Sequence, residues 1–112
     1  MAKTKTRPWD VVDHLQTEEE QLLYLEAAFE EGDATLIAAA LGDIARARGM
    51  TGVARKAGLG RESLYKALST NGNPHLDTIL RVMQALGFRL QATTSSYSGL
   101  QGPVDPKDAD LL

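Results

Sequence analysis

The stretch TGVARKAGLGRESLYKAL, residues 51–68, decides the fold that we predict for this chain of 112 residues. It is typical of two short helices joined by a tight turn. Two helices that cross steeply need small side chains where their axes approach, and Ala54 meets that need. Gly58 suits the turn, because glycine adopts a positive φ without a Cβ clash. We expect Leu59 and Leu64 to fill the space beneath the crossing.

The second predicted helix leaves polar and aromatic side chains on its outer face. In a helix-turn-helix protein, these positions face base edges in the major groove of DNA. An ordinary αα-corner with a polar outer face is the alternative, since short Ala- and Gly-rich helix pairs are common. Further predicted helices on both sides and a local excess of basic residues favour DNA binding. The outward-facing residues are Arg61, Glu62, Ser63, Tyr65 and Lys66.

Charge is distributed unevenly along the chain, although the formal net charge is only −3. Residues 10–33 contain nine acidic side chains and no basic one. Residues 34–92 contain eight basic and three acidic side chains, a local net charge of +5 that suits contact with phosphates. The acidic segment is either a solvated helix or a surface for a basic protein.

Composition and motifs argue against several classes of function. The chain has no cysteine, which excludes disulfides, thiol catalysis and cysteine-ligated zinc and suits a reducing cytoplasm. No apolar run approaches the roughly 20 residues that span a bilayer, and the basic N-terminus lacks the apolar core of a secretory signal. His14 and His75 are far apart, and we find no phosphate-binding loop or metal-ligand motif. We therefore expect a cytoplasmic protein that is not an enzyme and has no cofactor, metal, membrane partner or small-molecule substrate.

Helices are also predicted on both sides of the central stretch. Thr17 and Glu20 form a capping box at the start of an acidic helix over residues 17–31. Asp33 and Gly49 bound the next helix. The apolar residues that recur at helical spacing on these helices and on a last one are Leu22, Leu25, Phe29, Leu36, Ile37, Ala40, Leu41, Ile44, Leu76, Ile79, Leu80, Met83 and Leu86.

The end of the predicted domain alternates between apolar and polar residues. This alternation over residues 88–93 predicts a short strand. A lone strand is not stable in water, so we expect it to pair with its own copy in a homodimer. Residues 1–8 and 94–112 are predicted to be flexible tails of a domain over residues 9–93.

Three stretches carry a resemblance to a known family: TEEEQLLYLEAAFEEGD (17–33), LIAAALGDIARARGMTGVARKAGLGRESLYKALS (36–69) and GNPHLDTILRVMQALGFRLQA (72–92). Over roughly residues 9–92 the chain resembles the helix-turn-helix antidote proteins of type II toxin–antitoxin modules, broadly the HigA-like members of the Cro/repressor-type DNA-binding class. The expected fold is all-α, a five-helix Cro/repressor-like helix-turn-helix domain with an extra N-terminal helix and a short C-terminal strand.

The resemblance implies an antitoxin that acts as a homodimer. It would bind a palindromic operator in its own promoter, repress its operon, and neutralise a ribonuclease-like toxin of the RelE/ParE superfamily. The recognition helix would be Arg61–Leu68, with Arg61 as the best reader of guanine O6 and N7. The chain departs from similar proteins at Gly60 and His75, where a serine is usual. The candidate DNA contacts are Thr51, Arg55, Arg61, Glu62, Ser63, Tyr65, Lys66 and Ser69.

Contacts with protein partners are assigned to apolar residues. Trp9 either covers the core or anchors a partner, since tryptophan is frequent in interface hot spots. The acidic helix over residues 17–31 would attract a basic toxin, whereas many antitoxins use a disordered segment, which favours the C-terminal tail. The candidate toxin contacts are Trp9, Leu22, Leu25 and Phe29, and the candidate dimer contacts are Met83, Phe88 and Leu90.

Two other non-catalytic functions remain as alternatives. The first is a stand-alone helix-turn-helix transcriptional regulator without a toxin partner. Its gene would lack a short neighbouring reading frame for a basic protein. The second is a purely structural adaptor, which the local charge of +5 argues against.

Overall fold

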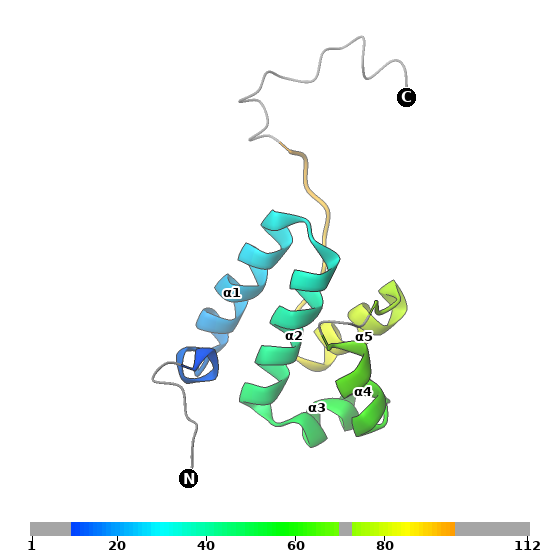
Figure 1. The fold of residues 1–112 in the computed structure, drawn as a ribbon. Helices are drawn as coiled ribbons and strands as arrows, with labels where there is room; N and C mark the ends of the chain where they lie inside the picture. Colours follow the sequence, from blue (N-terminus) through cyan, green and yellow to red (C-terminus); the bar gives the residue numbers. More distant parts are fainter. Residues whose placement is uncertain (1–9, 70–72, 96–112) are drawn as a thin grey trace.

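The computed structural model describes residues 10–69 and 73–95, and all regular structure in these residues is helical (Figure 1). The all-α prediction is therefore confirmed for this part of the chain. In Figure 1, α2 lies between α1 and the group formed by α3, α4 and α5. The elements are the 3-10 helix η2 (Val11–His14) and the α-helices α1 (Glu18–Glu31), α2 (Ala34–Arg48), α3 (Met50–Ala57), α4 (Arg61–Ala67) and α5 (Leu76–Ala85).

The predicted strand over residues 88–93 is not confirmed. Residues 10–69 and 73–95 contain no strand, and residues 89–94 form no backbone–backbone hydrogen bond within this described part of the chain. A strand requires a neighbour for its N–H and C=O groups, and residues 10–69 and 73–95 offer none at this position. Trp9 and the tail predicted over residues 1–8 lie outside the described residues, as does most of the predicted C-terminal tail.

The helix ends follow the capping chemistry expected from the sequence. The Thr17 hydroxyl accepts a hydrogen bond from the Glu20 N–H at 3.1 Å, and the Glu20 carboxylate accepts one from the Thr17 N–H at 3.0 Å. This completes the predicted capping box of α1. Asp33 caps α2 by accepting a hydrogen bond from the Thr35 N–H at 2.9 Å. Short-range sequence chemistry thus defines where these two helices begin.

The core contains mainly Ala, Leu, Ile and Val side chains, with contributions from all five α-helices. Leu41 and Ile44 of α2 and Leu64 of α4 are fully buried. Each such side chain contributes roughly 1.5–3 kcal/mol of hydrophobic stabilisation.

Four leucines that were predicted to lie on the apolar helix faces are instead exposed. In α1, α2 and α5, the apolar face of the helix is wider than the part of it that packs against the core. Residues at the edge of that face therefore remain accessible to solvent. These four exposed side chains are therefore available to a partner. They are Leu22, Leu36, Leu76 and Leu80, with exposed fractions of 40%, 42%, 63% and 44%.

Gly42 allows α2 to approach the C-terminal end of α4. A Cβ atom at this position would lie 3.3 Å from the backbone oxygen of Leu68, closer than most real Cβ contacts. The absence of a side chain at Gly42 therefore lets α2 pass close to the backbone at the end of α4.

Gln21 is a buried polar residue that joins η2, α1 and α2. Its Nε2 donates to the backbone oxygen of Leu15 at 2.9 Å, and its Oε1 accepts from Nε of Arg48 at 2.7 Å. The Arg48 guanidinium also lies 5.7 Å from the centre of the Phe88 ring, within the range of a cation–π contact. Arg48 therefore has a structural role at the end of α2.

Candidate nucleic-acid surface and partner groove

The turn between α3 and α4 is built from local hydrogen bonds and one positive φ. Gly58 has a φ of 73°, and its N–H donates to the backbone oxygen of Arg55 at 3.1 Å. The Leu59 N–H donates to the backbone oxygen of Ala54 at 2.9 Å, which closes the end of α3. Leu64 is fully buried beneath the crossing. The predicted pair of short helices is present, with its predicted turn.

All eight candidate DNA contacts are exposed, and they gather on two adjacent helices. Thr51 and Arg55 lie one turn apart on α3, and Ser69 follows the end of α4. Tyr65 is 54% exposed, an unusually open position for an aromatic side chain. The remaining four, all on α4, are Arg61, Glu62, Ser63 and Lys66.

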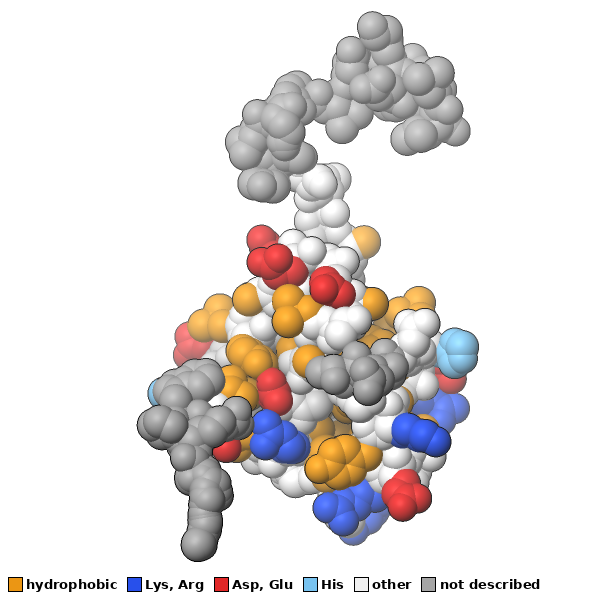
Figure 2. Space-filling view, viewed as in Figure 1, with side chains coloured by type: hydrophobic (Ala, Val, Ile, Leu, Met, Phe, Trp, Pro, Cys, Tyr) orange, Lys and Arg blue, Asp and Glu red, His pale blue; other side chains and the backbone are white. Residues whose placement is uncertain are grey.

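The basic side chains of this surface are not neutralised by neighbouring acids. Arg55, Arg61 and Lys66 form no ion pair with any residue in the described ranges. On the face shown in Figure 2, blue Lys and Arg side chains gather over the lower end of the molecule, and red Asp and Glu side chains dominate the upper end. Exposed, unpaired cations at one end of the molecule are available to anionic groups such as phosphates.

Gly60 and His75, the two positions where similar proteins were expected to have serine, are both helix N-caps. Gly60 is the N-cap of α4 and His75 is the N-cap of α5, and neither supplies a side-chain hydrogen bond. Lys56, although on α3, borders a separate cleft beside Glu18 and Gln84.

A chain of three polar side chains links α1 to the C-terminal half of α2. The Tyr24 hydroxyl donates to Asp43 Oδ2 at 2.6 Å, and Asp43 Oδ1 accepts from Nη2 of Arg46 at 3.0 Å. Burial, followed by the hydrogen bond to Asp43, raises the pKa of Tyr24 to about 12. Tyr24 therefore remains a hydrogen-bond donor throughout the physiological pH range. Sequence spacing could not reveal this contact, because Tyr24 and Asp43 lie 19 positions apart on different helices.

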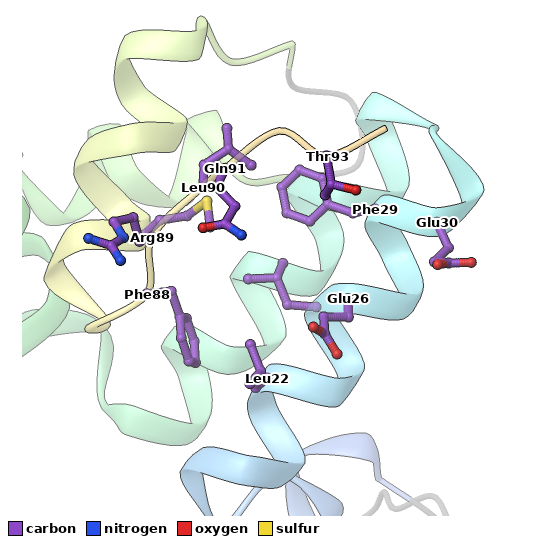
Figure 3. Close-up of a pocket in the computed structure, with 11 residues that line it drawn as sticks. Leu22, Glu26, Phe29, Glu30, Phe88, Arg89, Leu90, Gln91 and Thr93 are labelled. Atoms are coloured by element: carbon purple, nitrogen blue, oxygen red, sulfur yellow. The ribbon is translucent and has the colours of Figure 1, made fainter. Parts of the chain in front are cut away.

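A groove with a volume of about 460 Å³ lies between α1 and the segment that follows α5 (Figure 3). Leu22 and Phe29 of α1 and Phe88 of the following segment form much of its apolar lining. Glu26 and Glu30 add two carboxylates on the α1 side. The groove therefore combines apolar surface with negative charge.

This groove unites residues that were predicted to contact two different partners. The candidate toxin contacts Leu22, Leu25 and Phe29 line it together with the candidate dimer contacts Met83, Phe88 and Leu90. Leu25 and Met83 are buried, so a partner would meet them only at the base of the groove.

Leu76 and Leu80 were not named among the candidate dimer contacts, although the sequence of α5 is apolar over more than one face, which suits both core and dimer contact. Leu76 and Leu80 lie one helical turn apart on α5, and both are exposed. Their i, i+4 spacing was visible in the sequence, but spacing alone does not distinguish the core face of a helix from an exposed apolar one.

The described residues contain neither a cluster of metal-ligating side chains nor a helix that could span a membrane. No group of three or more His, Cys, Asp or Glu side chains in residues 10–69 and 73–95 is arranged to hold a metal ion. None of the helices in these ranges combines the length and apolar character that crossing a bilayer requires.

Comparison with known proteins identifies the family. A family model described as "Probable addiction module antidote protein" matches residues 5–94. An uncharacterized protein of Haemophilus influenzae (strain ATCC 51907 / DSM 11121 / KW20 / Rd) is 49% identical over 92 residues, which cover 82% of this chain and 95% of that protein. No solved structure matches the chain. The chain belongs to the family of probable addiction module antidote proteins.

Proposed function

We propose that this protein is the antitoxin of a type II toxin–antitoxin module, HigA-like, with a Cro/repressor-type domain over residues 9–93. It binds and neutralises a RelE/ParE-like toxin, and it represses its own operon as a homodimer on a palindromic operator. Membership of the antidote family supports the toxin-neutralising role. The observation that carries the DNA-binding role is the exposed, unpaired basic surface of α3 and α4.

The proposed recognition helix is α4, placed in the major groove. An α-helix with its side chains is about 10–12 Å in diameter, which suits a groove about 12 Å wide. Arg61 reads guanine, while Lys66 contacts phosphate. Glu62 either accepts from cytosine N4 or stabilises the start of α4. In the dimer, two copies of α4 lie about 34 Å apart, one turn of DNA.

The proposed dimer surface differs from the set assigned from the sequence, because Met83 is buried. Leu76 and Leu80 on α5 are exposed at a spacing that suits packing against another helix. Leu90 is also exposed, within a segment that forms no backbone–backbone hydrogen bond at residues 89–94 in the described part of the chain. Two such segments, one from each copy, would pair as strands, and the backbone N–H and C=O groups of each would then form hydrogen bonds with the other.

The proposed toxin site is the groove between α1 and the segment after α5. Its apolar lining suits an apolar segment of the toxin, and Glu26 and Glu30 attract basic side chains next to that segment. The rest of α1 supports this choice, since the helix contains six glutamates and no basic residue.

The DNA-binding role is tested by titrating the purified protein with its own upstream DNA and with scrambled DNA over a salt series. We expect tighter binding to the upstream DNA and a steep loss of affinity as salt rises, because phosphate contacts release counterions. Equal affinity for both DNAs at every salt concentration, with or without the toxin, would contradict the proposal.

The toxin site is tested by reversing charge in the groove with the double variant E26K/E30K. We expect a loss of several kcal/mol in affinity for the basic toxin, because like charges then face each other, while DNA binding is retained. Isothermal titration with the toxin encoded by the neighbouring gene measures the effect. The double variant E19K/E31K, at exposed positions of α1 outside the groove, makes the same change in charge and is the matched control. Equal losses in the two double variants would show that only the net charge of α1 matters.

The main alternative is a stand-alone transcriptional regulator. Such a regulator would bind DNA through the basic surface of α3 and α4, but its function would not require the acidic groove. A gene without a neighbouring reading frame for a small basic protein, and a protein that co-purifies with no such partner, would favour this alternative.

A further inference from the structure

We propose that Arg46, near the C-terminal end of α2, contacts a DNA phosphate and so extends the DNA-binding surface beyond α3 and α4. The inference rests on the proposed DNA-binding function. It adds a residue from a helix outside the α3–α4 pair, which the sequence did not assign to any partner.

The packing of α2 against α4 places Arg46 beside the proposed DNA contacts. Gly42 marks the close approach of α2 to the end of α4, and Arg46 lies one helical turn further along the same face. A pocket of about 180 Å³ is lined by Arg46 together with Tyr65 and Ser69. Arg46 therefore borders two residues of the proposed DNA-binding surface.

The Arg46 side chain is held in place while most of its donors remain available. One nitrogen, Nη2, donates to Asp43 at 3.0 Å, and Asp43 is itself held by the Tyr24 hydroxyl at 2.6 Å. A guanidinium has five N–H donors, and the Arg46 side chain is 39% exposed. A phosphate can accept hydrogen bonds from the remaining donors, and the fixed side chain loses less entropy on binding.

Arg48 also lies near the end of α2, but its side chain is not directed toward the proposed DNA-binding surface. Its Nε is bonded to the buried Gln21, and its guanidinium lies over Phe88. Both contacts direct Arg48 toward α1 and the segment after α5. Of these two arginines, only Arg46 lines the pocket beside Tyr65 and Ser69.

A cation at the flank of α4 meets the phosphate backbone that borders the major groove. Phosphate contacts raise affinity for any DNA sequence, and each adds about one unit to the slope of log K against log salt. Arg46 should therefore support affinity and salt dependence without affecting the choice of sequence.

The test compares wild type, Arg46→Gln and Arg46→Lys on upstream and scrambled DNA across a salt series. Glutamine keeps a hydrogen-bond donor for Asp43 but loses the charge. We expect Arg46→Gln to bind both DNAs roughly tenfold more weakly, with a slope reduced by about one for each copy in contact. Arg46→Lys should restore the slope. Arg81→Ala, which removes an exposed cation of α5, is the control and should leave the slope unchanged.

Three results would overturn the proposal. The first is an unchanged slope in Arg46→Gln while wild type binds DNA, which would make the ion pair with Asp43 purely structural. The second is a loss confined to the upstream DNA, which would indicate base reading. The third is an absence of DNA binding by wild type at any salt, which would remove the proposed DNA-binding function itself. Thermal unfolding of each variant separates lost contacts from lost folding.

Discussion

Leu64→Ala is expected to lower the free energy of unfolding by about 2–5 kcal/mol. Leu64 is fully buried, and it is the α4 side chain that packs beneath the crossing with α3. Truncation removes its hydrophobic contribution and leaves a cavity that a small domain cannot fully close. The free energy of unfolding of a domain is typically only 5–15 kcal/mol. The variant should therefore lose a large share of the stability of this domain. Urea unfolding followed by circular dichroism measures the change.

The neighbouring residue provides the control for this experiment. Tyr65 occupies the next position of α4 and is 54% exposed. Tyr65→Ala should change stability by only about 0.5 kcal/mol, as exposed substitutions usually do. If both variants had the same stability, Leu64 would not be the residue that fixes α4 to the core.

Arg61→Ala is expected to weaken operator binding by about 1–3 kcal/mol in each half-site and to relax sequence specificity. Arg61 is the first residue of α4, it is exposed, and it forms no ion pair with the described residues. A bidentate contact to guanine distinguishes one base from the others, so its loss affects the preferred DNA most. The ratio of dissociation constants for upstream and scrambled DNA measures this loss.

Lys66→Ala separates base reading from phosphate contact. It should weaken binding to both DNAs by a similar factor, because a phosphate contact carries no sequence information. If Arg61→Ala reduced both affinities equally, Arg61 would also be a phosphate contact. Specificity would then reside in other residues of α4.

The local elements of the fold could be predicted because each depends on neighbouring residues. The capping box of Thr17 and Glu20 involves two residues three positions apart. Two backbone hydrogen bonds close the turn at Gly58. One joins residues three positions apart and the other joins residues five positions apart. All eight candidate DNA contacts are exposed, because they lie outside the buried apolar positions of α3 and α4 that the sequence pattern predicts.

Predictions that depended on distant neighbours were less successful. The alternation over residues 88–93 suggested a strand, but a strand forms only with a partner, and the described part of the chain supplies none. Leu76 and Leu80 have the spacing of core residues, yet they lie beyond the edge of the contact that α5 makes. Apolar periodicity shows that a face is hydrophobic without showing what covers it.

The sequence by itself determined the all-α class, the α3–turn–α4 pair and the separation of acidic and basic residues along the chain, because short-range propensity, capping and composition act within a few residues. Only the tertiary structure decided which apolar side chains share one groove and which arginine lies beside α4. It also decided that Tyr24 holds Asp43, which in turn holds Arg46. These contacts join helices that are distant in sequence, and packing of the whole core sets their positions.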